Sequence, residues 1–181
     1  MGAGMAFRSL KNFLLGPIAV LALTGASFHG DRASITFPEG WTPAADKPAS
    51  AGLFESFEGN SSKTGANCNA QTKDLAPLAK LTLQDINTSL GHVYTLAEWA
   101  DLLGVEPAQL NVVTSEIRPF ADAFFHVGTL RYKADGNDVA VRYGFYVLPG
   151  RITMAGCYTP WADYPAYTAM FATTIDSLRP W

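Results

Sequence analysis

Cys68 and Cys157 are the two cysteines of the chain, and they are its first candidates for chemistry. A cysteine sulfur can serve as a nucleophile, as a metal ligand or as half of a disulfide. Cys157, in the segment "RITMAGCY", has neither a local histidine nor a glycine-rich turn that would activate it. Both cysteines lie in segments that are predicted to be strands. The sequence therefore favours a Cys68–Cys157 disulfide, and two buried free thiols or a reactive thiol are the alternatives.

His126 is the second candidate, because it is the one titratable polar residue inside the apolar segment "AFFHVGTL". Such a histidine is most simply a core residue that is bonded to a backbone carbonyl or a tyrosine hydroxyl. The alternative is an acid/base residue that works with a carboxylate such as Glu116 in a cleft, as in a small enzyme. Since His29, His92 and His126 are too widely spaced for a zinc site, the sequence predicts no metal and no cofactor.

A third group of candidates consists of aromatic residues near the C-terminus. The segment "CYTPWADY" is predicted to be a loop that leads into the last helix, and it carries Tyr158, Trp161, Asp163 and Tyr164. Packing at the rim of the core is the simplest explanation of this set. Tyrosine and tryptophan are also enriched at protein interfaces, so these four residues are the candidate interaction patch of the chain.

Residues 1–26 have the organisation of a secretory signal peptide. Arg8 and Lys11 precede an apolar run from Phe13 to Leu23, and the small residues Thr24-Gly25-Ala26 follow it. The run is short for a membrane span, and a retained anchor helix is the alternative interpretation. Cleavage after Ala26 predicts a periplasmic or secreted protein, in a compartment where disulfides form.

The remaining residues, 27–181, are predicted to form a single domain. Hydrophobic residues make up 48% of the whole chain, which is enough to build a globular core. The formal charge is −3, and loss of Arg8 and Lys11 with the signal peptide makes it −5. A domain with this charge and no basic stripe is not expected to bind nucleic acid or anionic membranes. The sequence also predicts no integral membrane segment after cleavage.

Hydrophobic periodicity divides this domain into strands, two helices, four more strands and a last helix. The early strands are "ASITF", "LFESFE" and "ANCNAQT", the helices cover 82–91 and 94–104, the later strands cover 111–120, 123–132, 139–148 and 151–158, and the last helix covers 164–178. Short connections make the later strands an antiparallel meander, and their apolar residues on both faces require cover on both sides. The sequence therefore predicts an α+β fold in which a central antiparallel sheet is flanked by helices, an αβα sandwich.

The turn Phe37-Pro38-Glu39-Gly40-Trp41 closes the first strand, and the last helix carries Phe171, Ile175 and Ser177. These residues and the order of elements, from Ser34 to Arg179, resemble the PsbP-like αβα sandwich superfamily. That group includes the photosystem II extrinsic protein, a Ran-binding import factor and exported bacterial DcrB-like proteins. The resemblance implies a binding or adaptor scaffold without a common catalytic set.

We therefore expect an exported, non-enzymatic protein with a protein partner that the sequence does not identify. It could act as a peripheral subunit of an envelope or membrane-bound assembly. The small periplasmic enzyme with His126 in a cleft is the alternative function.

The position of the signal peptide predicts that the mature protein begins at Ser27. Intact-mass spectrometry of the protein from its native host measures this directly. A mass that includes residues 1–26 would mean that the apolar run is an anchor rather than a cleaved signal.

Overall fold

The structure is a computed structural model that describes residues 26–29, 32–43, 53–60 and 65–181. The predicted signal peptide lies outside the described residues except for Ala26, which begins the first strand. The strands are β1 (Ala26–His29), β2 (Ala33–Phe37), β3 (Thr42–Pro43), β4 (Leu53–Asn60), β5 (Asn67–Asp74), β6 (Leu110–Phe120), β7 (Ala123–Ala134), β8 (Asn137–Leu148), β9 (Arg151–Pro160) and β10 (Arg179–Pro180). The α-helices are α1 (Leu83–Leu90), α2 (Leu96–Leu103) and α3 (Tyr164–Asp176), and the 3₁₀ helices are η1 (Ala76–Lys80), η2 (Pro107–Gln109) and η3 (Trp161–Asp163).

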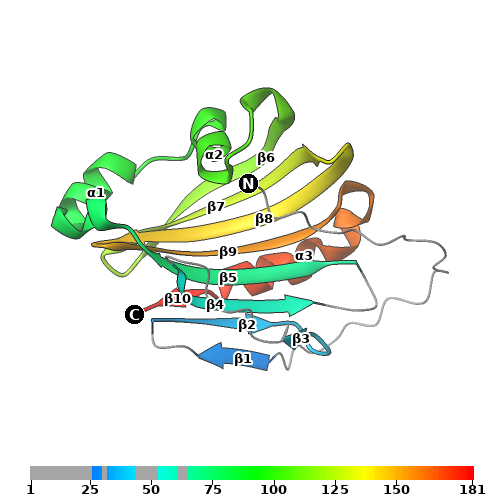
Figure 1. Cartoon of the computed structure of the whole chain (residues 1–181), viewed down its shortest axis with the longest axis horizontal. Helices are drawn as coiled ribbons and strands as arrows, with labels where there is room; N and C mark the ends of the chain where they lie inside the picture. The colour runs from blue at the N-terminus through cyan, green and yellow to red at the C-terminus, as the bar shows by residue number, and fades with distance from the viewer. Residues whose placement is uncertain (1–25, 30–31, 44–52, 61–64) are drawn as a thin grey trace.

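Seven of these strands form one antiparallel sheet in the order β3-β4-β5-β9-β8-β7-β6 (Figure 1). The predicted meander is present, because β6, β7, β8 and β9 are neighbours in chain order. The turn between β7 and β8 is Asp135-Gly136, where both residues have positive φ angles of 51° and 79°. Such angles at both central residues match the twist of a two-residue hairpin. After β9 the sheet continues with β5, which is distant in sequence.

A second sheet corrects the prediction for the first strand. β2 does not join the central sheet but pairs with β1 and β10 in a three-stranded sheet. β10 has only two residues, Arg179 and Pro180, which is too short for any residue pattern to predict a strand. The side chain of Ser177, between α3 and β10, accepts a hydrogen bond from the backbone N–H of Thr36 at 2.8 Å.

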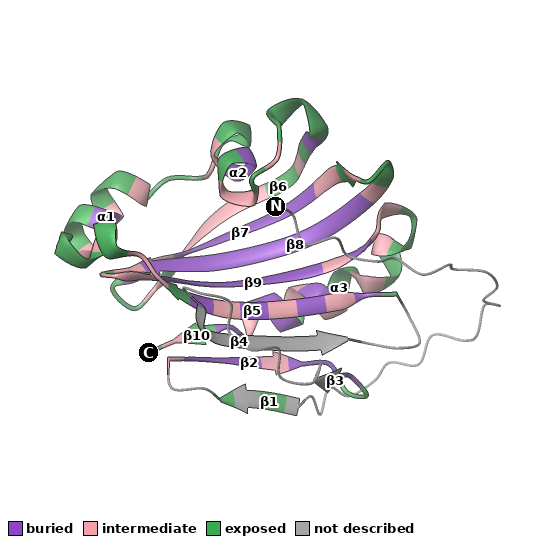
Figure 2. Cartoon of the chain, in the orientation of Figure 1, coloured by how far each residue is buried: buried purple, intermediate pink, exposed green. Residues whose placement is uncertain are grey.

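The central sheet is buried on both faces, as Figure 2 shows for β7, β8 and β9. One face packs against α1 and α2 in a cluster that includes Trp99, Leu130, Val141, Phe145 and Met154. We call this the α2 face. The opposite face packs against α3 and β2 in a cluster that includes Phe37, Val127, Tyr146, Phe171 and Ile175. We call this the α3 face.

Helices α1 and α2 begin where the sequence predicts. Thr82 and Thr95 are the N-caps, and the side chain of each accepts a hydrogen bond from the backbone N–H three residues later, of Asp85 or Glu98. The carboxylate of Asp85 or Glu98 in turn accepts a hydrogen bond from the backbone N–H of the threonine. Leu96 is not part of the buried face of α2, because its exposed fraction is 42%. It stands at the first position of a two-turn helix whose contact with the sheet is made by Trp99.

Trp99 is completely buried and docks α2 onto the sheet. Its indole N–H donates to Ser115 Oγ at 2.9 Å, and that hydroxyl donates to the Tyr94 carbonyl at 2.9 Å. The ring lies directly on Gly128 of β7, where a Cβ atom would stand 2.7 Å from a ring carbon of Trp99. The absence of a side chain at position 128 is therefore a condition for this packing.

Replacing Gly128 with alanine should lower the free energy of unfolding by about 1–3 kcal/mol, because the enclosed Trp99 ring has no space into which it can move. Chemical denaturation measures this, and near-UV circular dichroism should report a changed tryptophan environment. Leu96→Ala on the same helix is the control and should have little effect. Equal stabilities of wild type and Gly128→Ala would contradict the packing described here.

Candidate functional site

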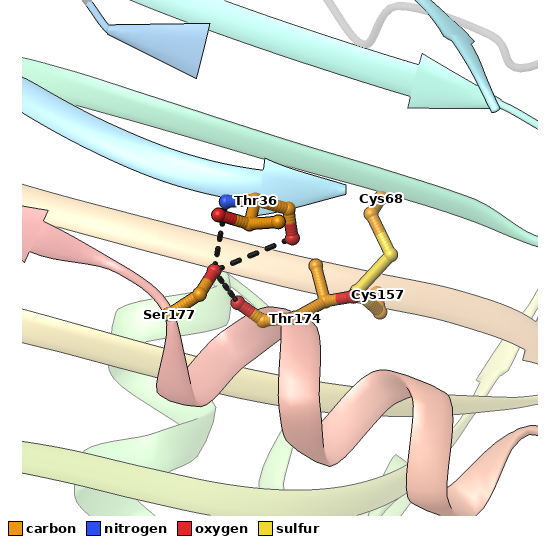
Figure 3. Close-up of a disulfide and its surroundings, with 5 residues drawn as sticks. All are labelled: Thr36, Cys68, Cys157, Thr174 and Ser177. Carbon is orange, nitrogen blue, oxygen red and sulfur yellow. Dashed lines mark hydrogen bonds between the residues drawn. A yellow bond between two sulfur atoms is a disulfide. The ribbon is translucent and has the colours of Figure 1, made fainter. Parts of the chain in front are cut away.

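The structure contains a disulfide between Cys68 on β5 and Cys157 on β9 (Figure 3). The two residues are register partners, their Cα atoms lie 4.0 Å apart, and both side chains are fully buried. β5 thus lies beside β9, as pairing of the two cysteines requires. Because the bond is enclosed in the core of the α3 face, neither sulfur is presented to a substrate.

The elements around the disulfide are held by a hydroxyl bridge. Ser177 Oγ accepts from the Thr36 N–H and donates to the Thr174 carbonyl at 2.6 Å (Figure 3). This connects β2 to the end of α3 next to the bonded cysteines. The cluster is built of apolar and mutually satisfied polar groups, so its role is structural.

The structure brings together Trp161 and Tyr164 but not the whole predicted patch. Their rings stack with centroids 5.8 Å apart, and the Arg131 guanidinium lies 5.0 Å from the Trp161 ring. Asp163 between them is exposed. Tyr158 packs on the α2 face, whereas Tyr164 packs on the α3 face. The candidate patch is therefore reduced to Trp161, Asp163 and Tyr164, which we call the Trp161 surface.

The segment that carries these residues is not the predicted loop. β9 continues to Pro160, and η3 then leads without a break into α3. Because Tyr158 is inside a paired strand, alternation along β9 directs it to the face opposite Cys157. The strand pairing explains why adjacent aromatic residues separate in space.

His126 is a core residue with an exposed fraction of only 2%. Its ring stacks on Phe145 at 4.8 Å and lies 4.7 Å from the Tyr94 ring, on the α2 face. Nδ1 is buried without a hydrogen-bond partner, so the expected bond to a carbonyl or a tyrosine hydroxyl is not present at this nitrogen. Burial lowers the pKa of His126 to about 4, and the nearby charge of His92 acts in the same direction.

Glu116 and His126 are not brought together. Glu116 pairs in register with Val127, and Ile117 pairs with His126, so the two side chains lie on opposite faces of the sheet. Glu116 instead accepts two hydrogen bonds from Arg118, at 2.7 and 3.0 Å, which hold the pKa of its carboxyl below the ordinary value. The acid/base pair of the enzyme interpretation is therefore not assembled in this structure.

The sequence interpretation did not single out Arg142, a buried arginine on β8. Its exposed fraction is 8%, and its Nη1 donates to Thr129 Oγ1 at 2.9 Å. A charged residue in the middle of the apolar segment "VAVRYGFYVL" was the signal that could have identified it.

No group of three or more histidine, cysteine, aspartate or glutamate residues that could hold a metal ion occurs among the residues that the structure describes. Within the same residues, none of the helices has the length and apolar character needed to span a bilayer.

The disulfide should stabilise the folded protein. It closes a loop across a sequence separation of 89 residues, which contributes roughly 4–5 kcal/mol in the chain-entropy model. Cys68→Ser and Cys157→Ser should each lower the melting temperature by about 10 °C under oxidising conditions. Reductant should lower that of the wild type and leave the double serine variant unchanged. A wild-type melting temperature that equals that of the double variant would mean that the bond does not form in solution.

The buried His126 should make the stability of the fold depend on pH. An unfolded chain protonates this histidine near its ordinary pKa of 6.5, but the folded chain resists protonation down to about 4. Because the unfolded state then binds more protons, the free energy of unfolding should fall by about 2 kcal/mol from about pH 7 to about pH 5. Denaturant titrations at each pH measure this fall.

His126→Leu should remove most of this pH dependence, whereas the exposed His29→Gln should keep it. The chosen pH window lies above the range in which Glu98, whose pKa is lowered to about 2 by its bond from the Thr95 backbone, loses its contribution. A slope that persists in His126→Leu would assign the effect to another group.

Known proteins resemble this chain in structure rather than in sequence. No protein-family model matches the chain, and no curated protein sequence matches it. Cyanobacterial PsbP (CyanoP) from Synechocystis sp. PCC 6803 matches with a TM-score of 0.58 and 13% identity, over 92% of this chain and 99% of that chain. PA94 from Pseudomonas aeruginosa, a protein of unknown function, matches with a TM-score of 0.50 and 12% identity, over 87% of this chain and 97% of that chain. The resemblance in the sequence is therefore confirmed at the level of the fold: the chain has an α+β structure similar to that of PsbP.

Proposed function

We propose that the protein is an exported, non-catalytic binding or adaptor module that engages a protein partner through the Trp161 surface. The observation that carries this proposal is the stacked pair of Trp161 and Tyr164, which is half-buried and lies beside the Arg131 guanidinium. Tryptophan, tyrosine and arginine are the residues that most often supply binding energy at interfaces. An aromatic pair that is already stacked loses little side-chain freedom when a partner covers it.

The residues of the Trp161 surface are held in place by the sheet and by α3. Trp161 begins η3 directly after β9, and Tyr164 is the first residue of α3. The Tyr164 hydroxyl lies 3.3 Å from Thr129 Oγ1 on β7, so the ring is fixed to the sheet at its polar end. Arg131 is in turn held by Asp138 at 2.7 Å. Such a surface suits recognition by shape better than adaptation to many partners.

Export is part of the same proposal. A disulfide enclosed in the core supports folding in an oxidising compartment, where the mature chain would comprise residues 27–181 as one domain. We assign its layers to the αβα sandwich class, with α1 and α2 on one face of the sheet and α3 on the other. In this form the protein would serve as a periplasmic or secreted subunit, or as a peripheral component of an envelope assembly.

The experiment that tests the function is site-specific photo-crosslinking in the native host. A photoreactive residue at the exposed position Asp163 should give one discrete adduct with a protein partner, whereas the same residue at Leu96 on the α2 face should not. Adding Trp161→Ala should weaken capture from position 163 about 30-fold, which corresponds to the loss of a hot-spot residue.

Leu96→Ala is the matched control, because it removes an exposed apolar side chain elsewhere. Equal melting temperatures of the two variants would exclude unfolding as the cause. Capture that is the same from positions 163 and 96, or that survives Trp161→Ala, would reject the Trp161 surface as the binding site.

A further inference from the structure

Arg142 is a buried cation whose hydrogen-bonding capacity is mostly unused. It projects from β8 onto the α3 face, where Nη1 donates to Thr129 Oγ1 at 2.9 Å and approaches Thr114 Oγ1 at 3.4 Å. Nε is buried without a partner. Nη2 makes no hydrogen bond in the described chain and, unlike Nε, is not enclosed. Because an arginine side chain stays charged at all ordinary pH values, its burial carries the desolvation cost of a full positive charge.

The ion pairs of the α3 face leave Arg142 without a carboxylate. Arg118 forms ion pairs with both Glu116 and Asp176, and Arg131 forms one with Asp138. No ion pair within 4.0 Å joins Arg142 to an acid of the described residues. Glu116 is near enough for the Arg142 charge to act on it, but both hydrogen bonds of its carboxylate within the described residues join Oε2 to Arg118, and none joins it to Arg142.

A buried charge without a counter-ion is costly, since its desolvation is not repaid by an attractive partner. Polar side chains of β7 and α3 nevertheless lie next to Arg142. Thr129 is its register partner on β7, and Arg131 is a diagonal neighbour on the same face. The Tyr164 hydroxyl contacts the same Thr129 oxygen that Arg142 binds. Arg142 therefore adjoins the Trp161 surface through shared polar contacts.

We propose that Arg142 forms the floor of a carboxylate-binding site between Thr114 of the edge strand β6 and Tyr164 of α3. Nη2, the end of the guanidinium that is neither enclosed nor hydrogen-bonded, can donate its N–H groups to a carboxylate oxygen, and such charge-assisted hydrogen bonds are strong. One uncompensated charge matches a monoanion, and the neighbouring Glu116 and Asp138 disfavour a phosphate dianion. The inference rests on the Trp161 surface only for the suggestion that a partner protein supplies the carboxylate.

The test uses sodium acetate and ¹⁵N NMR of the purified protein. The Nε–H of Arg142 gives its own resonance, which should shift saturably with millimolar acetate and not with chloride at equal ionic strength. Inorganic phosphate should bind more weakly than acetate. Arg142→Met should abolish the response of the Thr129 backbone amide to acetate, whereas Lys133→Met, which removes an equal charge from the neighbouring strand β7, should retain it.

The variant Glu116→Gln distinguishes a carboxylate-binding site from an internal ion pair between Glu116 and Arg142. The variant should bind acetate at least as tightly as the wild type, because it removes a competing negative charge. If Glu116 instead neutralises Arg142 in solution, this variant would move the Arg142 Nε–H resonance before any acetate is added. Such a shift would overturn the proposal. The proposal would also be overturned by an acetate response that does not saturate, by an equal response to chloride, or by tighter binding of phosphate than of acetate.

A capped acidic peptide identifies the source of the carboxylate. Binding that is at least tenfold tighter than that of acetate supports an acidic segment of a partner protein, whereas equal affinity supports a small carboxylate as the ligand. These titrations need no cellular partner, so they can succeed or fail independently of crosslinking at Asp163.

Discussion

Burial of both faces of β7, β8 and β9 is the constraint on which the rest of the structure depends. A sheet that is apolar on both sides must be covered twice, and each cover is made possible by a glycine. Gly128 leaves space on one face for Trp99 of α2, and Gly144 leaves space on the other for Ile175 of α3, whose methyl carbon would stand 2.5 Å from an added Cβ. The helices are therefore positioned by the glycine positions of the sheet, which carry no side chain, as much as by their own apolar stripes.

The disulfide extends this arrangement to the first half of the chain. The meander from β6 to β9 is held by short connections, but β5 joins it from far away in sequence. Long-range strand pairing carries a large loop-closure cost, and the Cys68–Cys157 bond reduces that cost by constraining the unfolded chain. Ser177 then binds β2 to α3 near the bonded cysteines. The small sheet is thus bound to the end of α3, and β2 also packs against β5 in the core of the α3 face.

Local patterns predicted what depends on local physics. The starts of the helices near Thr82 and Thr95 and the alternation within β7 and β8 are properties of a few consecutive residues, and the structure contains them. The failures concern register and partner choice. The reverse turn after Phe120 decides that Glu116 lies opposite Val127 and not beside His126, and a shift of one residue would have placed them on the same face. Tyr158 was separated from Trp161 for a similar reason, because the length of β9 cannot be judged from its composition.

The α3 face also explains where binding chemistry can be placed on this fold. α3 packs near β8 and β9, while the edge strand β6 presents Thr114, Glu116 and Arg118 as exposed or half-exposed groups on the same face. Polar residues there cost the fold little, but Arg142 is different, because it lies in the buried part of β8. An apolar side chain of similar volume would satisfy the packing without the desolvation of a charge, and such replacements of buried ions often stabilise proteins. Stability alone therefore gives no reason for a guanidinium at this position, whereas a carboxylate ligand at the margin of the Trp161 surface does.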